Sequence, residues 1–168
     1  MEADFDEWAR ARSGALLRAA FLLTGDQHHA EDLVQETLVR VALSWRRIEN
    51  APDAYAQRIL YRLQVARWRR SRLRETPTPS PPETGQPDLS ASVDLRLALG
   101  DALARLTRRQ RAVLVLRYYE DRSEAEAAAI LGCSVGTVKS QTHKAIAALR
   151  QSSRELSDII VEPVDSDG

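Results

Sequence analysis

The chain has 168 residues, 43 % of them hydrophobic, which is enough for one domain of ordinary size or two small ones with packed cores. Its 24 basic and 24 acidic side chains give a formal net charge of zero, which by itself argues against a nucleic-acid partner. The single cysteine excludes an internal disulfide, and no apolar run approaches the roughly 18 residues of a membrane-spanning helix. The first residues are acidic and carry no secretory signal, so we expect a cytoplasmic protein without membrane insertion.

The zero net charge conceals a segregation of charge along the chain. Residues 1–74 contain 13 basic and 10 acidic side chains (+3), and residues 95–154 contain 11 basic and 5 acidic ones (+6). Residues 75–94 and 155–168 contain no basic side chain, and they contain 4 and 5 acidic ones. This pattern fits two nucleic-acid-facing domains joined by a solvated linker and followed by an acidic tail, although uneven surface charge also arises by chance.

Apolar residues at helical spacing predict three helices in the first part of the chain, over residues 5–23, 28–45 and 54–74. Gly25 is placed to end the first helix, and Asp53 is placed to cap the third after a loop. The second helix has a charged outer face that is either solvated or meets a basic partner helix: Glu31, Asp32, Gln35, Glu36 and Arg40.

The third predicted helix carries seven arginines, namely Arg58, Arg62, Arg67, Arg69, Arg70, Arg72 and Arg74. So many guanidinium groups repel each other unless an anion lies alongside, and arginine pairs well with phosphate. Tyr55, Tyr61 and Trp68 lie among them, which suits a helix that follows a nucleic-acid backbone while aromatic rings receive an unstacked base. The alternatives are a merely solvated basic face and aromatic rings that belong to the core, and for Trp68 we favour the core.

The segment 75–94 has five prolines and few apolar residues, which predicts a flexible tether. Two further helices are expected over residues 95–106 and 108–119. They would build a small four-helix domain, over residues 95–154, with the two helices that follow. The tail, residues 155–168, is expected to fray.

Residues 123–150 read as two helices joined by a short turn. Ser123 and Glu126 form a potential capping box, Gly132 follows the last apolar residue of the first helix, and Ser134 can cap the second. The expected apolar faces comprise Ala127, Ile130, Leu131, Val138, Ala145, Ile146 and Leu149. The opposite, polar face of the second helix carries Lys139, Ser140, Gln141, His143 and Lys144. This is a helix-turn-helix pattern with a face able to read the major groove; the alternative is an ordinary helical hairpin with a solvated side.

The sequence shows no constellation of an enzyme. It contains no phosphate-binding glycine loop, no metal-spaced His and Cys cluster and no nucleophile with a neighbouring base, so we expect no metal, no cofactor and no small-molecule substrate. His28 and His29 are adjacent on a helix and cannot face one ion, and His143 stands alone. Cys133 lies in the helix-turn-helix turn, where we interpret it as a small packing residue.

Four stretches together resemble an extracytoplasmic-function (ECF) sigma factor of the sigma-70 family, in particular its actinobacterial SigE-type branch. They are Ala30 to Thr37, the arginine-rich third helix, Arg109 to Leu114, and Leu131 to Ser140. The resemblance covers residues 1–150 in the family's order. It implies an all-α chain with two small helical domains, sigma region 2 over 1–74 and sigma region 4 over 95–154.

The resemblance also implies partners and sites. Core RNA polymerase would bind Asp32, Gln35, Glu36 and Arg40, so that reversing Asp32 or Glu36 lowers polymerase affinity without unfolding the chain. The segment 46–74 would open the −10 promoter element and capture non-template bases, using Tyr55, Arg58, Arg62, Arg67, Arg69 and Arg70. Lys139, Ser140, Gln141, His143 and Lys144 would read the −35 element as duplex. Gln141 departs from the family's frequent arginine and favours adenine. Arg122 stands where an apolar residue is frequent. An anti-sigma factor is a further expected partner.

Two other classes of protein fit parts of this pattern. A dimeric helix-turn-helix regulator would bind duplex DNA without polymerase, but it gives no role to the arginine-rich helix behind a tether. A helical protein-binding adaptor would not need seven arginines on one helix.

Overall fold

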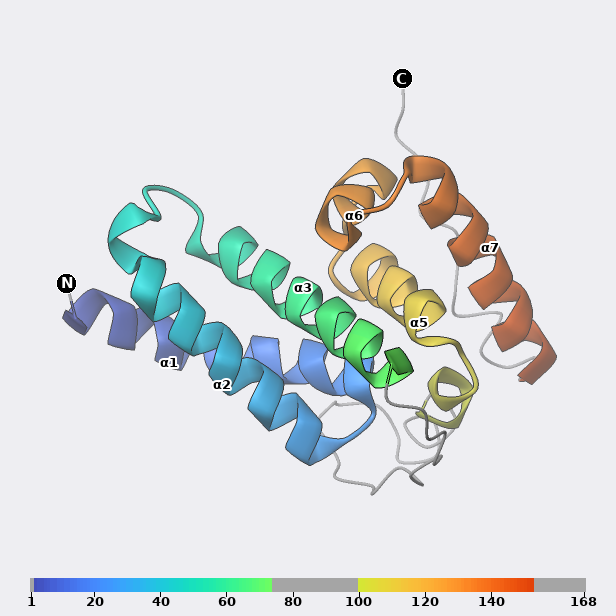
Figure 1. The fold of residues 1–168 in the computed structure, drawn as a ribbon, viewed down its shortest axis with the longest axis horizontal. Helices are drawn as coiled ribbons and strands as arrows, with labels where there is room; N and C mark the ends of the chain where they lie inside the picture. Colours follow the sequence, from blue (N-terminus) through green and yellow to red (C-terminus); the bar gives the residue numbers. More distant parts are fainter. Residues whose placement is uncertain (1, 74–99, 153–168) are drawn as a thin grey trace. The chain divides into compact units, whose positions relative to one another are not determined.

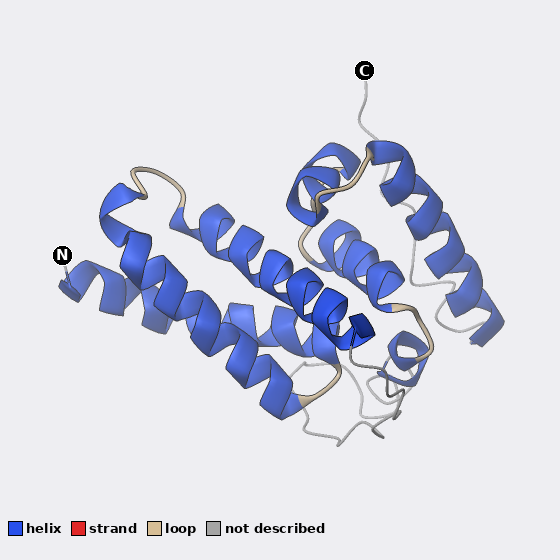
Figure 2. Cartoon of the chain, in the orientation of Figure 1, coloured by secondary structure: helices blue, strands red, loops and turns tan. Residues whose placement is uncertain are grey.

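The computed structural model describes residues 2–73 and 100–152, and every element in these residues is helical, as predicted (Figures 1 and 2). The chain divides into two compact units, one within residues 1–87 and one within residues 88–168. The predicted tether, the acidic tail and the start of the predicted helix 95–106 lie outside the described residues.

The first unit contains three helices: α1 (Glu2–Thr24), α2 (Gln27–Ser44) and α3 (Pro52–Leu73). Each of them contacts the other two. Their shared core is apolar, with Leu23, Leu33, Val41, Leu60 and Tyr61 all at most 2 % exposed. The tight turn between α1 and α2 uses the left-handed conformation of Gly25 (φ 69°), and the Asp26 side chain caps α2 by accepting a hydrogen bond from the His29 backbone N–H.

The ends of these helices differ from the prediction at two places. After α2 the chain tightens into a 3-10 turn, η1 (Trp45–Arg47), in which Trp45 is the first residue. Helix α3 begins at Pro52, whose fixed φ suits the first helical position, so the expected capping role of Asp53 is wrong. Asp53 lies inside the first turn, where its carboxylate instead accepts a hydrogen bond from Trp8 Nε1 and pairs with Arg12.

The second unit consists of a helical segment at 100–104, α5 (Arg108–Leu114), α6 (Glu124–Leu131) and α7 (Val135–Ser152). Thr107 caps α5 in a reciprocal capping box with Gln110. The predicted helix 108–119 forms, but its last part widens into a π-helical turn, η2 (Val115–Tyr119). All seven residues expected on the apolar faces of the helix-turn-helix are buried.

Two arginines of the second unit are structural. The Arg111 Nε donates to the Leu103 carbonyl at 3.1 Å, and Arg117 Nη1 donates to the Arg122 carbonyl at 2.6 Å. Burial lowers the pKa of the Arg111 guanidinium, which bonds a backbone oxygen near the end of the segment 100–104. Arg117 fixes the connection that leads into α6, because Arg122 directly precedes the Ser123 cap.

Gly132 lies in the left-handed region (φ 67°) at the end of α6, as its position predicted. We expect Gly132→Ala to lower the free energy of unfolding by about 1 kcal/mol, through backbone strain alone, because an added Cβ there meets no atom within 4 Å. Gly136→Ala is the matched control, since it lies in helix α7 and its Cβ would make only ordinary contact, so it should stabilise by about 0.5–1 kcal/mol. Denaturant melts of both variants check the opposite signs; equal losses would contradict this account of the turn.

Candidate nucleic-acid and partner-binding surfaces

The helix-turn-helix is built as its sequence predicted. Ser123 Oγ accepts a hydrogen bond from the Glu126 N–H at 3.1 Å, and Glu126 Oε2 accepts one from the Ser123 N–H at 2.8 Å. Two backbone N–H groups at the start of α6 therefore have hydrogen-bond partners. The hydrogen bond from the Ser123 N–H lowers the pKa of Glu126. After Gly132, Ser134 Oγ accepts from the Thr137 N–H at 3.1 Å and starts α7. These local caps fix where α7 begins and therefore which of its residues point outward.

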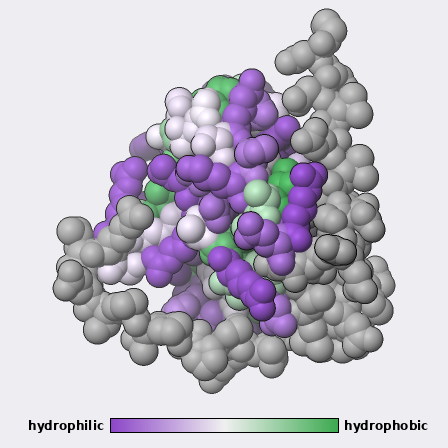
Figure 3. All heavy atoms as spheres, turned by 90° about the vertical axis from the view of Figure 1, so that its right-hand side faces the viewer, coloured by the Kyte–Doolittle hydropathy of each residue, from purple (hydrophilic) through white to green (hydrophobic). Residues whose placement is uncertain are grey.

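Four of the five predicted reading residues on α7 are exposed, namely Lys139, Ser140, His143 and Lys144. The fifth, Gln141, is half-buried. Lys139 Nζ lies 3.6 Å from Glu124 Oε2 of α6, so this lysine is held at one edge of the face. Seen from the side on which α7 lies in Figure 1, the described surface is mostly hydrophilic (Figure 3). Val135 was not among the predicted reading residues, yet it is 40 % exposed in the first turn of α7, the part of a recognition helix that meets base edges.

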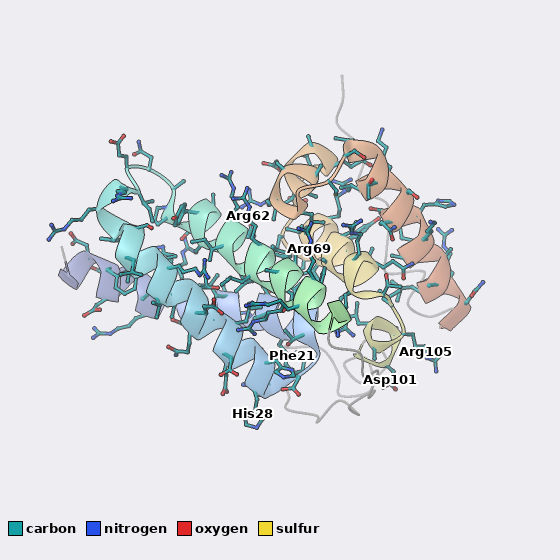
Figure 4. All side chains as sticks on the ribbon, in the orientation of Figure 1. Phe21, His28, Arg62, Arg69, Asp101 and Arg105 are labelled. Carbon is teal, nitrogen blue, oxygen red and sulfur yellow. The ribbon has the colours of Figure 1, made fainter. Side chains whose placement is uncertain are left out.

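Helix α3 separates the predicted arginines into two groups. Arg58, Arg62 and Arg69 recur at helical spacing and are exposed, and Arg70 is exposed beside them. Arg62 and Arg69 lie on the side of α3 away from α2 (Figure 4). Among the described residues no acidic side chain pairs with any of these four, so their charge is available to an external anion. We refer to Arg58, Arg62 and Arg69 as the arginine stripe.

Arg67 belongs to the other side of α3. Its Nη2 lies 3.2 Å from Glu36 Oε2, and Arg40 Nη2 lies 3.1 Å from Glu36 Oε1, so one carboxylate of α2 joins two arginines. Burial raises the pKa of Glu36, but the hydrogen bonds from Arg67 and Arg40 outweigh it and keep this pKa below its ordinary value. Glu36 therefore links α2 to α3, and a charge reversal there would change the packing of the unit as well as any partner contact.

The aromatic residues of α3 also divide. Tyr61 is 1 % exposed and belongs to the core, whereas Tyr55 is half-buried near the start of the helix. Trp68 is half-buried, and its indole nitrogen is enclosed without a hydrogen-bond partner in the described part of the chain. This supports the interpretation of Trp68 as a packing residue. The side chains of Arg72 and Arg74 are outside the described residues.

The outer ridge of α2 combines charge with apolar surface. Asp32, Gln35 and Arg40 are exposed, as expected for a face that meets a partner. Sequence periodicity did not single out Val39 and Leu43, which are 57 % and 82 % exposed on the same helix. Large exposed apolar side chains beside charged ones are typical of a protein-binding surface. We call Asp32, Gln35, Val39, Arg40 and Leu43 the α2 ridge.

The residues that the structure describes contain no group of three metal-ligating side chains able to hold an ion. Across the same residues, no helix has both the length and the apolar character needed to cross a membrane.

An all-helical unit with a capped helix-turn-helix, together with a separate unit bearing an unpaired arginine stripe, defines a DNA-binding protein of two parts.

Comparison with known proteins agrees with this class. The family models for Sigma-70 region 2 and Sigma-70, region 4 match residues 8–74 and 96–149. The RNA polymerase sigma-E factor of Streptomyces coelicolor is 41 % identical over 150 residues, covering 88 % of this chain and 85 % of the relative. The ECF RNA polymerase sigma factor SigL of Mycobacterium tuberculosis is 40 % identical over 167 residues, covering 93 % and 90 %.

Among solved structures, the sigma factor RpoE in complex with the anti-sigma factor NepR, from Bartonella quintana, has a TM-score of 0.72 and 29 % identity, covering 89 % of this chain and 96 % of that one. The chain belongs to the sigma-70 family, as an RNA polymerase sigma factor of the ECF type.

Proposed function

We propose that the two units divide promoter recognition between them. Residues 1–74 bind core polymerase and open the −10 element, and residues 95–154 read the −35 element as duplex, with residues 75–94 as the tether. The observation that carries this proposal is the separation of two chemically different surfaces on two units: the unpaired arginine stripe on α3 and the polar face of α7.

The −10 surface comprises the arginine stripe, Arg70, Tyr55 and the loop at 48–51 that precedes α3. The exposed guanidinium groups fit the phosphates of a separated strand, and the loop lies next to the start of the helix, where a flipped base can be held. Arg67 joins this surface only if Glu36 releases it, because the two side chains are paired at 3.2 Å.

The −35 surface comprises Lys139, Ser140, Gln141, His143 and Lys144 on α7. Ser140, His143 and Lys144 are exposed on consecutive turns, which suits contact with base edges along the major groove. Gln141 is half-buried at the edge of this face. Its amide favours adenine where an arginine would favour guanine.

The α2 ridge is the proposed surface for core polymerase, with Glu36 beside it. Its exposed Val39 and Leu43 supply the apolar contact that a stable protein interface needs at its centre. We also propose an anti-sigma factor as a partner, because RpoE, a relative at 29 % identity, was solved with one. Since core polymerase is cytoplasmic, the protein acts in the cytoplasm, as a subunit for recognition and not as an enzyme.

Run-off transcription with purified core polymerase on genomic fragments, followed by mapping of the start sites, tests the proposed function. We expect discrete start sites that depend on the protein and share sequence blocks at about −35 and −10. A dimeric operator-binding regulator, the alternative, would give no start sites of its own and would bind its DNA without polymerase.

Lys144→Ala tests the −35 assignment. If Lys144 reads a base, the variant should lose about 1–3 kcal/mol of preference for the mapped −35 duplex over a duplex changed at that base pair. The measurement is holoenzyme affinity for both duplexes, with Arg150→Ala, a more C-terminal exposed cation of α7, as the control. An equal loss on both duplexes would show that Lys144 contacts phosphate instead.

A further inference from the structure

The loop between η1 and α3 is exposed and strained. Glu49, Asn50 and Ala51 are exposed, and Ala51 has φ 75°, a conformation that residues with a Cβ rarely adopt. The Asn50 side chain makes no hydrogen bond within the described residues, so its amide donors and its acceptor are available to a ligand. Strained loops of this kind persist only where the surrounding structure holds them, and they are frequent at ligand clamps.

One side chain of α1, Trp8, contacts residues on both sides of this loop. The Trp8 ring packs against Trp45, which begins η1 just before the loop, with ring centroids 5.4 Å apart. Phe5 completes an aromatic cluster, 5.4 Å from Trp45 and 6.0 Å from Trp8. On the far side of the loop, Trp8 Nε1 donates to Asp53 Oδ1 at 2.7 Å. Trp8 therefore connects Trp45, the first residue of η1, with Asp53 in the first turn of α3, on the other side of the loop.

Asp53 uses both oxygens for this purpose. Oδ1 accepts from Trp8, and Oδ2 pairs with Arg12, one turn further along α1. A carboxylate in the first turn of α3 also interacts favourably with the helix dipole. The Arg12 and Asp53 side chains are 52 % and 47 % exposed, and exposed pairs of this kind add little to overall stability. Their main structural effect is local: they fix the start of α3 relative to α1.

We propose that Trp8 and Asp53 are positioning residues that hold the loop 48–51 in the shape that receives an unstacked base of the −10 element. This inference rests on the proposed function of the loop and adds the residues that keep it preorganised. Neither residue lies in the loop or in the arginine stripe. They act on the two sides of the loop, at the Trp45 ring and at the first turn of α3, so that the strained Ala51 and the Asn50 amide are already in place before DNA arrives.

The experiment uses holoenzyme and fork-junction DNA from a promoter mapped by run-off transcription. The fork is duplex through the −35 element and has a single-stranded non-template strand across the −10 element. A series of forks, each with one abasic position in that strand, identifies the captured base. For the wild-type protein, removing this base should weaken binding roughly 10- to 100-fold.

Asp53→Ala is the main variant, because it leaves the aromatic cluster intact, and Trp8→Phe is the second. We expect both variants to bind the intact fork almost as weakly as wild type binds the abasic fork, while their affinity for the abasic fork stays unchanged. Their melting temperatures should fall by no more than about 3 °C. Asp6→Ala, at another exposed acid of α1 without an ion pair among the described residues, should retain the full difference between the forks.

The outcomes separate this inference from the function on which it rests. Variants that keep the wild-type difference between intact and abasic forks would overturn the positioning role, and so would an equal loss of affinity on both forks. If the wild-type protein itself showed no position sensitive to base removal, base capture by the loop would be wrong, and the positioning role would fall with it.

Discussion

Reversing the charge of Arg62 and Arg69 together, as Arg62→Glu with Arg69→Glu, should weaken holoenzyme binding to −10 fork DNA by at least roughly 100-fold, because like charges facing each other across an interface cost several kcal/mol. Both residues are exposed and lack an acidic partner among the described residues, so the fold does not depend on their charge. Fluorescence anisotropy with a labelled fork at several salt concentrations measures the loss. The slope of log affinity against log salt should also become shallower by about 1.4, at roughly 0.7 for each lost phosphate contact.

The matched control is the double reversal of Arg10 and Arg18, which are exposed on α1. This control changes the net charge by the same amount as the reversal of Arg62 and Arg69. It should retain most of the wild-type affinity and salt dependence. Equal effects of the two double variants would mean that the total charge of the unit, and not the arginine stripe, attracts DNA.

The second large effect is expected at the α2 ridge. Leu43 is 82 % exposed, so Leu43→Asp should leave the fold unchanged, yet it would place a charge in the apolar centre of the proposed polymerase interface. Buried anchors of interfaces contribute about 2 kcal/mol or more, so the dissociation constant for core polymerase should rise at least about 30-fold. Titration of labelled protein with core polymerase measures this constant.

Asp32→Lys is a second variant on the same ridge and should also weaken the complex. It is preferable to reversal of Glu36, because Glu36 joins α2 to α3 through Arg67 and its loss would affect the unit itself. Asp6→Lys on α1 is the control of equal charge change. Unchanged affinity of Leu43→Asp and Asp32→Lys for core polymerase would place the interface elsewhere.

Much of the fold was predictable because its determinants are local. The Ser123 and Glu126 capping box, Gly132 at the end of α6 and the apolar spacing of α7 all involve residues within a few positions of each other. Such patterns can be read from a single sequence. For the same reason, the helix-turn-helix was predicted correctly, and four of the five residues predicted on its outer face are exposed.

What the sequence did not reveal depends on contacts between distant residues. Nothing local shows that the Asp53 carboxylate accepts a hydrogen bond from Trp8, 45 residues earlier. Helical spacing places Arg67 on the opposite side of α3, but nothing local shows that Glu36, 31 residues earlier, pairs with it there. The sequence is consistent with Val39 and Leu43 in a helix, but it does not show that among the described residues no other element covers them. Partner-facing apolar surface is visible only once the packing is known.

The central claim is that this protein recognises promoters only as a subunit of polymerase. Footprinting on the mapped promoter, with and without core enzyme, tests this claim most directly. Permanganate detects the unpaired thymines in the same experiment. We expect protection near −35 and reactive thymines near −10 only when the protein and core polymerase are both present. Protection of the intact duplex by the protein alone, with no change on adding core enzyme, would contradict it.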